Sequence, residues 1–405
     1  MQRLTCVLRK RVARFALVCV VAAALLVLAT VAWSQTLTWL GTLGGNRSWA
    51  WDVSNNGVVV GGATNAAGQE RAFRWENGVM QDLGTLGGSY SWAFGVSADG
   101  SVVAGMALNA AGQSRAFRWT VDGGMQDLGA LGGSWSDAWG VSADGRVVVG
   151  YSANRAFRWT VDGVMQDLGT LGGSLSWARG VSADGSVVVG MAHNAAEQRR
   201  AFRWTVGGGM QDLGTLGGNS SEAYGVSADG SVVVGTAHNA AGQSHAFRWT
   251  VGGGMQDLGT LDGNNSGAYG VSADGSVVVG GSGGRPFRWT AANGMEDLNL
   301  TYAILRTIGS VLSVAQAISA DGRYIAGRGY NAATGRPEAF LLDTRCTPHN
   351  GDVDANGCVD DADLLQVLFA FGNTGSNLVR VDVNCDDTVD DADLLIVLFN
   401  FGSGC

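Results

Sequence analysis

The chain has 405 residues, of which 64 are glycine and only 15% are charged, and its formal net charge is −9. A hydrophobic content of 46% with so little charge excludes a largely disordered protein. The negative net charge argues against nucleic acid as a partner, because a phosphate backbone attracts basic surfaces.

Residues 1–34 read as a signal peptide. Basic residues between Arg3 and Arg14 precede an apolar run over residues 15–32, and Ala32 and Ser34 supply the small residues of a cleavage site. We therefore expect a secreted, extracellular protein that starts near Gln35. The alternative is an uncleaved membrane anchor, because the apolar run approaches the minimum length of a spanning helix. No other membrane contact is expected.

A unit with three sequence marks then recurs along the chain. The first mark, Gly-Val-Ser-Ala-Asp-Gly, has its serine at Ser54, Ser97, Ser142, Ser182, Ser227, Ser272 and Ser319. The second, Ala-Phe-Arg-Trp, has its tryptophan at Trp75, Trp119, Trp159, Trp204, Trp249 and Trp289, with a degenerate copy at Ala339-Phe340. The third is Met-Gln-Asp-Leu-Gly-Thr-Leu-Gly-Gly. The tryptophans lie 40 to 45 residues apart, a period typical of propeller blades.

Each unit reads as a four-stranded antiparallel meander. In the unit from Gly140, short strands are expected over 140–142, 146–150, 155–160 and 165–171, separated by glycine-containing turns. The last unit lacks a fourth strand, and residues 37–45 carry that strand's pattern. We predict a seven-bladed β-propeller over residues 35–343, in which residues 37–43 close the ring beside Phe340.

The repeated Arg and Asp residues of adjacent strands are predicted to form cross-strand ion pairs. The pairs are Arg74–Asp82, Arg118–Asp127, Arg158–Asp167, Arg203–Asp212, Arg248–Asp257 and Arg288–Asp297. The Phe and Trp of the same mark are expected in the core between blades. In addition, His245-Ala246-Phe247 makes the unit similar to a bacterial extracellular repeat family named for its His-Ala-Phe signature, which implies an exported repeat protein without an assigned activity.

After a linker at residues 344–350, residues 351–405 contain two acidic loops with calcium-ligand spacing. Calcium loops place oxygen ligands at positions 1, 3, 5, 7, 9 and 12, the seventh through a backbone carbonyl. The loops predict two calcium ions, held by Asp352, Asp354, Asn356, the Cys358 carbonyl, Asp360 and Asp363, and by Asp382, Asn384, Asp386, the Thr388 carbonyl, Asp390 and Asp393.

Each loop runs into Asp-Ala-Asp-Leu-Leu and an apolar helix, and this paired motif over residues 351–403 resembles a type I dockerin. The resemblance implies docking to a cohesin-like protein. Two features depart from the usual recognition pattern: loop positions 10 and 11 are Asp-Ala in both copies, and the helix positions are Leu368-Phe369 and Leu398-Phe399. The alternative is that these apolar helices pack on each other or on the propeller.

Four cysteines outside the signal peptide indicate two disulfides, as is common in small exported domains. Three pairings are possible. We favour Cys346–Cys405 with Cys358–Cys385, because the first would join the ends of a two-fold symmetric domain.

Ligand binding is expected on the side of the propeller where loops vary. Five aromatic residues are placed there, and flat rings beside Asn and Ser suit a glycan or a protein partner: Trp49, Tyr90, Trp92, Trp135 and Trp177. The alternative is that they pack between blades. A second set, expected to pack within the first strand of each unit, is Trp51, Phe94, Trp139, Tyr224 and Tyr269.

No catalytic residue is predicted. His193 and His238 hold equivalent loop positions without a recurring nucleophile, and only Asp137 and Glu222 stand out as carboxylates that could converge. The sequence therefore favours a secreted, non-catalytic interaction protein that binds glycan or protein. The alternatives are a propeller enzyme acting on polysaccharide, as hydrolase or lyase, and a structural component of the cell envelope.

Overall fold

A computed structural model describes residues 35–345, 350–354, 356–374, 378, 380–386 and 388–405. The predicted signal peptide and most of the predicted linker lie outside these residues. Within the described part of the chain, no helix is both long and apolar enough to cross a membrane.

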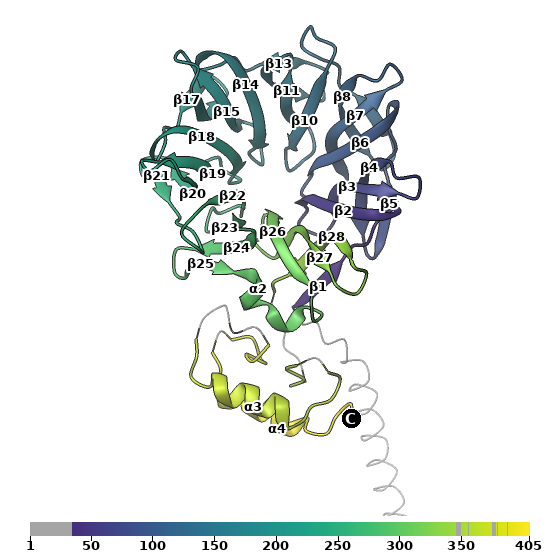
Figure 1. Cartoon of the computed structure of the whole chain (residues 1–405), viewed down its shortest axis with the longest axis vertical. Helices are drawn as coiled ribbons and strands as arrows, with labels where there is room; N and C mark the ends of the chain where they lie inside the picture. Colours follow the sequence, from purple (N-terminus) through teal and green to yellow (C-terminus); the bar gives the residue numbers. More distant parts are fainter. Residues whose placement is uncertain (1–34, 346–349, 355, 375–377, 379, 387) are drawn as a thin grey trace, which may run out of the picture. The chain divides into compact units, whose positions relative to one another are not determined.

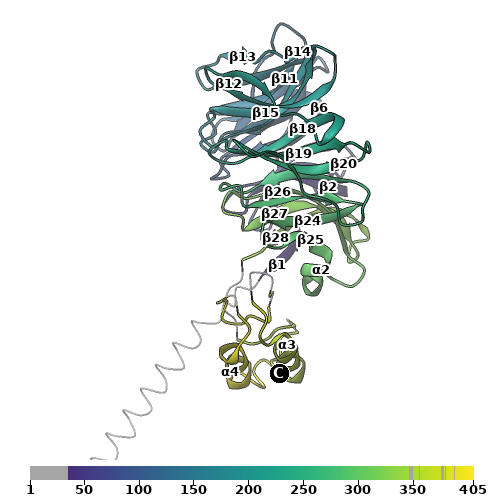
Figure 2. The ribbon, with the colours of Figure 1, turned by 90° about the vertical axis from the view of Figure 1, so that its left-hand side faces the viewer.

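Residues Thr36–Thr344 form a compact unit of seven four-stranded antiparallel sheets arranged in a ring (Figure 1), and the centre of the ring holds a channel. The predicted seven-bladed β-propeller is confirmed. Figure 2 shows the same ring of blades from the side. The first strand of each blade lies nearest the channel, and these strands are β2 (Gly44–Val53), β6 (Gly87–Val96), β10 (Ser136–Val141), β14 (Gly172–Val181), β18 (Gly217–Val226), β22 (Ser266–Val271) and β26 (Val311–Ile318).

Outside the channel strands, each blade adds a second and a third strand. The second strands are β3 (Val59–Asn65), β7 (Val102–Asn109), β11 (Val147–Ser152), β15 (Val187–Asn194), β19 (Val232–Asn239), β23 (Val277–Ser282) and β27 (Tyr324–Asn331). The third strands are β4 (Glu70–Glu76), β8 (Ser114–Thr120), β12 (Arg155–Thr160), β16 (Arg199–Thr205), β20 (Ser244–Thr250), β24 (Arg285–Thr290) and β28 (Arg336–Asp343). The outermost strands are β5 (Val79–Asp82), β9 (Gly124–Asp127), β13 (Met165–Asp167), β17 (Gly209–Asp212), β21 (Gly254–Asp257), β25 (Gly294–Asp297) and, in the closing blade, β1 (Thr36–Trp39).

The closing blade joins the two ends of the propeller sequence as predicted. Strand β1 pairs antiparallel with β28, so that Thr36 faces Asp343 and Trp39 faces Phe340. The Trp39 ring meets Phe340 edge-on, with centroids 6.2 Å apart. This pairing covers the outer edge of β28, which would otherwise be open to another strand.

The hydrophobic core lies between neighbouring blades. The phenylalanine of every strand mark is fully buried, and its tryptophan is at most 8% exposed, as predicted. In one of these inter-blade clusters, Val147 and Val149 of β11 pack with Phe202 and Trp204 of β16. The repeated apolar pattern therefore holds adjacent blades together through their facing sheets.

Hydrogen bonds also link each blade to the next around the channel. In each turn after a channel strand, the residue that follows serine donates its backbone N–H to the equivalent residue of the next blade, as Ala98 does to the Ala143 carbonyl at 3.0 Å. At the seam, Ala320 donates to the Asn55 side-chain oxygen at 2.9 Å. We call this closed ring the hydrogen-bond belt; its members are Asn55, Ala98, Ala143, Ala183, Ala228, Ala273 and Ala320.

The predicted Arg–Asp cross-strand pairs are wrong by one residue of register. Arg118 faces Gln126, whereas Asp127 faces Phe117, because Thr120 pairs with Gly124 across a turn one residue shorter than expected. The same shift recurs in the other blades. Arg118 Nε instead donates to the Gly145 carbonyl of the next blade at 2.9 Å. The repeated arginine is thus an inter-blade contact, and Asp127 lies 3.9 Å from Arg115.

A buried serine makes a second inter-blade link. Ser91 Oγ accepts the Ala72 N–H at 2.9 Å and donates to the Gly84 carbonyl at 2.6 Å. At the seam, Ser48 Oγ accepts the Ala339 N–H in the same way at 2.9 Å.

Replacing Ser91 by Ala is expected to lower the free energy of unfolding by about 1–3 kcal/mol, because it leaves the buried Ala72 N–H without an acceptor. Urea denaturation of the wild type and S91A measures the loss. The exposed Ser89→Ala is the matched control and should leave stability unchanged. A loss in S91A no larger than in the control would contradict the proposed link.

Two features of the propeller were not expected from the sequence. Four channel strands begin at the Gly-Gly of the third mark, well before the expected first strand, because the longer second strands of those blades reach far enough to pair with them. The connection into the closing blade forms two short helices, α2 (Leu298–Thr301) and η1 (Ala303–Leu305). The Asn299 amide anchors α2 to β26 by donating to the Leu312 carbonyl at 2.8 Å.

The described residues from 350 onward belong to a second compact unit. It contains two helices, α3 (Asp361–Ala370) and α4 (Asp391–Phe399), each following one acidic loop. Its core is a small cluster of valines drawn equally from the two copies: Val353, Val359, Val367, Val383, Val389 and Val397. A core of this size contributes little burial, so the unit depends on other sources of stability.

Candidate functional sites

One side chain from each blade lines a cavity of about 350 Å³ in the propeller channel. We call these seven residues the channel ring: Trp51, Phe94, Trp139, Arg179, Tyr224, Tyr269 and Gln316. An adjoining hollow of about 180 Å³ is lined by the same residues together with Asp52 and the next residues of the channel strands. Concave sites of this size with aromatic walls and a few polar groups are the usual form of a small-molecule site.

The aromatic side of the channel ring is a packed stack. Phe94 and Trp139 lie nearly parallel with centroids 4.1 Å apart, and the Arg179 guanidinium lies 4.0 Å above the Trp139 ring. Trp51 meets Phe94 edge-on at 5.5 Å. Both faces of Trp139 are therefore in contact with neighbours, which fixes this wall of the cavity.

The opposite side of the ring is polar. Arg179 forms an ion pair with Glu222 at 3.1 Å, and both side chains are half-buried. Tyr224 and Tyr269 contact each other with centroids 5.5 Å apart. Burial raises the pKa of Tyr224 to about 12, with a further contribution from the nearby Glu222 carboxylate. The tyrosine hydroxyl is therefore neutral at physiological pH and offers both a donor and an acceptor.

The carboxylates that the sequence singled out as a possible pair each have a partner of their own. Glu222 is bound to Arg179, while Asp137 accepts a hydrogen bond from the Ser114 hydroxyl. Among the described residues, no contact joins Asp137 to Glu222. His193 likewise pairs with Glu197 of its own loop at 2.8 Å, and His238 contacts Asn219 at 3.0 Å.

Close packing of the channel strands explains why glycine follows most ring members in the sequence. A Cβ on Gly140 would lie 2.9 Å from the Arg179 carbonyl oxygen, and one on Gly180 would lie 2.8 Å from the Tyr224 carbonyl oxygen. Glycine therefore lets the channel strands approach one another. Asp52 holds this position in the first blade, where it adds a carboxyl group to the channel lining.

Asp52 links the first two blades. One carboxylate oxygen accepts the Val53 N–H at 2.8 Å, and the other accepts the Val96 N–H of the next blade at 2.9 Å. Burial raises the pKa of Asp52 to about 7, and the two backbone hydrogen bonds only partly oppose this shift. The group therefore titrates near neutral pH rather than near its usual value.

Asp52 is expected to make the propeller less stable as the pH rises towards neutrality. Because its folded pKa of about 7 exceeds the unfolded value of 3.8, the folded state holds the proton more tightly. The resulting stability is fully present below about pH 4 and is lost as the pH rises through 7. The loss is at most about 4 kcal/mol and is reduced by screening from channel water.

The measurement compares urea denaturation of the wild type and Asp52→Gly between pH 4 and 8, since glycine occupies this position in five other blades. The difference in stability between the two proteins should shift in favour of D52G as the pH rises. Asp122→Gly, an exposed turn residue that is glycine in two later blades, is the control. Parallel pH profiles for wild type and D52G would contradict the expected titration.

Four of the five aromatics expected on loops lie in strands instead. Trp49, Tyr90, Trp92 and Trp177 lie within the channel strands β2, β6 and β14, and Trp135 directly precedes β10. These strands are longer than expected at this end, so the loop assignment is wrong for Trp49, Tyr90, Trp92 and Trp177, whereas Trp135 lies in a loop as predicted. All five are half-buried.

These rings pack on one another between blades, yet each keeps part of its surface exposed. Trp49 and Trp92 have centroids 5.2 Å apart, and Tyr151 lies between Trp135 at 5.4 Å and Trp177 at 5.3 Å. Three of them, Trp49, Trp92 and Trp177, lie two residues before a ring member on the same strand. We call the five predicted aromatics the rim.

Sequence reasoning assigned the aromatic ring members to packing and missed Arg179 and Gln316. A signal was present, because this position changes from blade to blade while the preceding Ala and the following Gly-Val-Ser are nearly constant. A variable position in the innermost strand of a repeat indicates a lined channel.

The first acidic loop brings three predicted ligands together. The carboxylate oxygens of Asp352, Asp354 and Asp363 lie within 4.8 Å of one another. Asp352 Oδ1 is buried without a hydrogen-bond partner, and burial together with the neighbouring carboxylates raises the pKa of Asp354. A hard cation would satisfy the unpaired oxygen and relieve the repulsion, so the residues fit the calcium set predicted from spacing.

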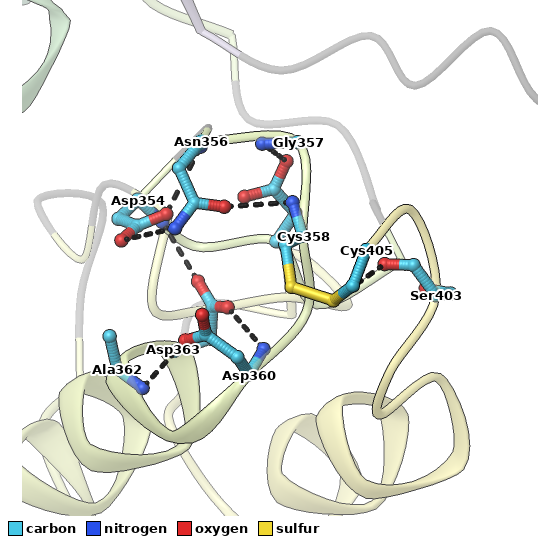
Figure 3. The surroundings of a disulfide bond; sticks show 10 residues. Asp354, Asn356, Gly357, Cys358, Asp360, Ala362, Asp363, Ser403 and Cys405 are labelled. Carbon is cyan, nitrogen blue, oxygen red and sulfur yellow. Dashed lines mark hydrogen bonds between the residues drawn. A yellow bond between two sulfur atoms is a disulfide. The ribbon is translucent and has the colours of Figure 1, made fainter.

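The remaining predicted ligands of this loop surround the same cluster (Figure 3). Asn356 Nδ2 donates to Asp354 at 3.1 Å, and Asn356 Oδ1 accepts the Cys358 N–H at 2.7 Å. Asp360 caps helix α3 by accepting the Ala362 N–H. Its carboxylate thus has a structural role at the helix start.

The second loop repeats this geometry in its described residues. Asp393 accepts the Asn384 N–H at 3.0 Å and the Asp390 N–H at 2.9 Å, as Asp363 does with its equivalents. Asp386 accepts the Thr388 N–H at 3.0 Å, and the Asp386 N–H donates to Asp382 Oδ1 at 3.1 Å. Asp390 caps α4. The two loops therefore share the contacts of their last aspartate and of their helix cap, while the cluster of three carboxylates is found in the first loop.

The predicted disulfide pairing is wrong for Cys358 and Cys405, which bond to each other (Figure 3). The cause is local chain pairing, because Val359 exchanges backbone hydrogen bonds with Gly402 and Ser403 at 2.8 and 3.0 Å. This pairing brings the Cα atoms of the two cysteines to 4.7 Å. Cys385 is also disulfide-bonded, and Cys346 lies outside the described residues.

Both helices of this unit expose large apolar side chains. Phe369 and Phe399, whose positions the sequence associates either with docking or with packing, are 86% and 83% exposed. The exposed set is symmetric between the two copies: Leu365, Leu368, Phe369, Leu395, Leu398 and Phe399. Contiguous exposed apolar residues of this kind commonly mark an interaction surface.

No family model and no curated protein matches the chain. Among solved structures, TolB from Acinetobacter baumannii is 13% identical over 76% of this chain and 65% of its own, with a TM-score of 0.42. A putative TolB from Agrobacterium tumefaciens is 14% identical over 67% of this chain and 95% of its own, with a TM-score of 0.41. The chain thus spans less than two thirds of the first structure. We draw no functional argument from these similarities.

Proposed function

We propose that this is a secreted, non-catalytic interaction protein whose propeller binds a glycan or a protein at the rim and the channel beneath it. The observation that carries the proposal is the composition of the channel ring, in which five of seven members are aromatic. The charged groups nearest the cavity are held in structural contacts: Arg179 by Glu222, and Asp52 by two backbone N–H groups. A mostly aromatic lining of this kind favours ligand binding.

We further propose that the C-terminal unit binds two calcium ions and attaches the protein to a cohesin-like or other surface protein. The unpaired oxygen of Asp352 and the carboxylate cluster of the first loop support the metal, and the matching contacts of Asp363 and Asp393 extend the proposal to the second loop. The exposed apolar helices support attachment. Calcium here would supply structural stability rather than chemistry, because it would lie among carboxylates that cap and anchor the helices.

The test uses the full mature protein with calcium on an array of bacterial and plant glycans, and a pull-down from the culture medium of the source cells. Binding that falls at least tenfold in Trp92→Ala, with unchanged thermal unfolding, would support the propeller as the binding module. Trp249→Phe, a conservative change in the core between blades, is the control. Hydrolysis or cleavage of any polysaccharide would overturn the non-catalytic assignment.

A further inference from the structure

We propose that the cavity inside the channel ring binds one neutral sugar residue, either free or at the end of a glycan chain. This inference rests on the proposed function and adds to it a site, a size limit and a ligand charge. The rim was the surface predicted to bind, whereas the channel ring lies deeper in the same strands.

The volume limits the ligand to a small molecule. A cavity of about 350 Å³ with an adjoining hollow of about 180 Å³ lies at the lower end of small-molecule sites. Its volume is too small for a folded segment of another protein. A glycan could therefore enter only by its end.

The charges of the lining select a neutral ligand. A cation would meet the Arg179 guanidinium, and an anion would meet the Asp52 carboxyl group. Glu222 does not line the cavity and acts on a ligand only through its ion pair with Arg179. Arg179 and Glu222 already neutralise each other, so neither offers a free charge. A charged ligand of either sign would lose its hydration without gaining an unshared partner.

The polar groups of the lining suit hydroxyl groups. The indole N–H groups of Trp51 and Trp139 are both buried without a hydrogen-bond partner, so the channel ring carries donors that no protein group uses. Gln316 and Tyr269 add an amide and a hydroxyl, each able to donate and to accept. A sugar carries apolar C–H faces and hydroxyls on one small ring, so it can meet the aromatic wall and these polar groups together.

The ring is also held in place before any ligand arrives. Phe94, Trp139 and Arg179 form a continuous stack, and the glycines that follow them bring the channel strands into backbone contact. The hydrogen-bond belt closes the same strands into a ring. A preorganised site loses little entropy when it binds, which favours a small ligand.

The experiment measures binding to the full mature protein by calorimetry and tryptophan fluorescence. Each of three hexoses (glucose, galactose and mannose) is compared with its uronate and its 2-amino derivative, which keep the ring but add a negative or a positive charge. We expect at least one neutral hexose, or a neutral oligosaccharide ending in it, to bind at least tenfold tighter than both charged forms. Binding of the oligosaccharide alone would identify a chain end as the ligand, and binding of the free hexose would identify a monosaccharide.

Three conservative variants locate the site. Trp51→Phe removes the indole N–H and keeps a ring, Tyr269→Phe removes a hydroxyl, and Gln316→Ala removes the amide. Each is expected to weaken neutral-sugar binding about tenfold, the effect of one lost hydrogen bond. Asp122→Gly, in an exposed turn outside the channel and the rim, is the control and should retain the affinity for a single hexose.

The outcomes separate this inference from the proposed function. Tighter binding of a charged sugar or of tetramethylammonium, unchanged affinity in all three variants, or no binding of any neutral sugar would overturn the channel site. If glycan or protein binding persists in the three variants and is lost in Trp92→Ala, the interaction function stands and the channel site falls. Absence of every glycan and protein partner would remove both.

Discussion

Removing calcium is expected to unfold the C-terminal unit of the protein. Its core is six valines, and the first loop gathers three carboxylates that repel one another without a cation. With calcium at about 1,000 times the dissociation constant, each site would add about 4 kcal/mol, which exceeds what so small a core supplies. Chelation should therefore abolish the far-UV helical signal of α3 and α4, and calcium should restore it.

Calorimetry on chelator-treated protein should show two binding events per chain. Asp363→Asn is expected to remove one of them, because Asp363 joins the cluster to the backbone of its own loop. Asp361→Asn is the matched control, since Asp361 is exposed in the first turn of α3. Two unchanged events in D363N, or a helical signal that survives chelation, would contradict the metal assignment.

A mature chain that begins at Gly41, without β1, is expected to lose roughly 4 kcal/mol of propeller stability. Leu37 and Trp39 pack into the core of the closing blade, and each such side chain contributes about 1.5–3 kcal/mol when fully buried. The truncated protein should also self-associate, because the edge of β28 becomes available to another strand. Urea denaturation and size-exclusion chromatography measure the two effects.

Strand complementation provides the control for this truncation. A synthetic peptide of residues 35–45 should restore stability and the monomeric state by pairing with β28. The same peptide with Leu37 and Trp39 changed to Ser should not, because it loses both core side chains. Equal stability of the truncated and intact chains would show that β1 does not hold the ring closed.

The ring itself could be predicted from the sequence because its signals repeat. The missing outer strand of the last unit and the matching pattern near Leu37 identify the closing blade before any coordinates are known. The valine-rich second strands and the Phe-Arg-Trp mark could also be predicted as buried, because apolar residues recur at the same positions in each unit.

What could not be predicted depends on turn geometry and on pairing between distant segments. The Arg118–Asp127 assignment failed because one residue of turn length reverses which side chains face each other. The Cys358–Cys405 bond depends on hydrogen bonds of Val359 with Gly402 and Ser403. No local sequence pattern predicts these contacts between distant segments. The channel ring was missed because an aromatic residue in the innermost strand is expected both where blades pack and where a channel is lined.

The closing blade also explains why β1 pairs with β28 and with no other third strand, although the units are nearly identical. In the first six blades the third strand is followed, after a short turn, by its own outer strand, whose high local concentration excludes any competitor. Only β28 lacks an outer strand that follows it in sequence. Its edge is therefore the one available to β1, however similar the other blades are. Duplication or loss of an internal unit would leave the outer edge of the last third strand unpaired. The number of blades could then change, and β1 would still close the ring by pairing with that edge.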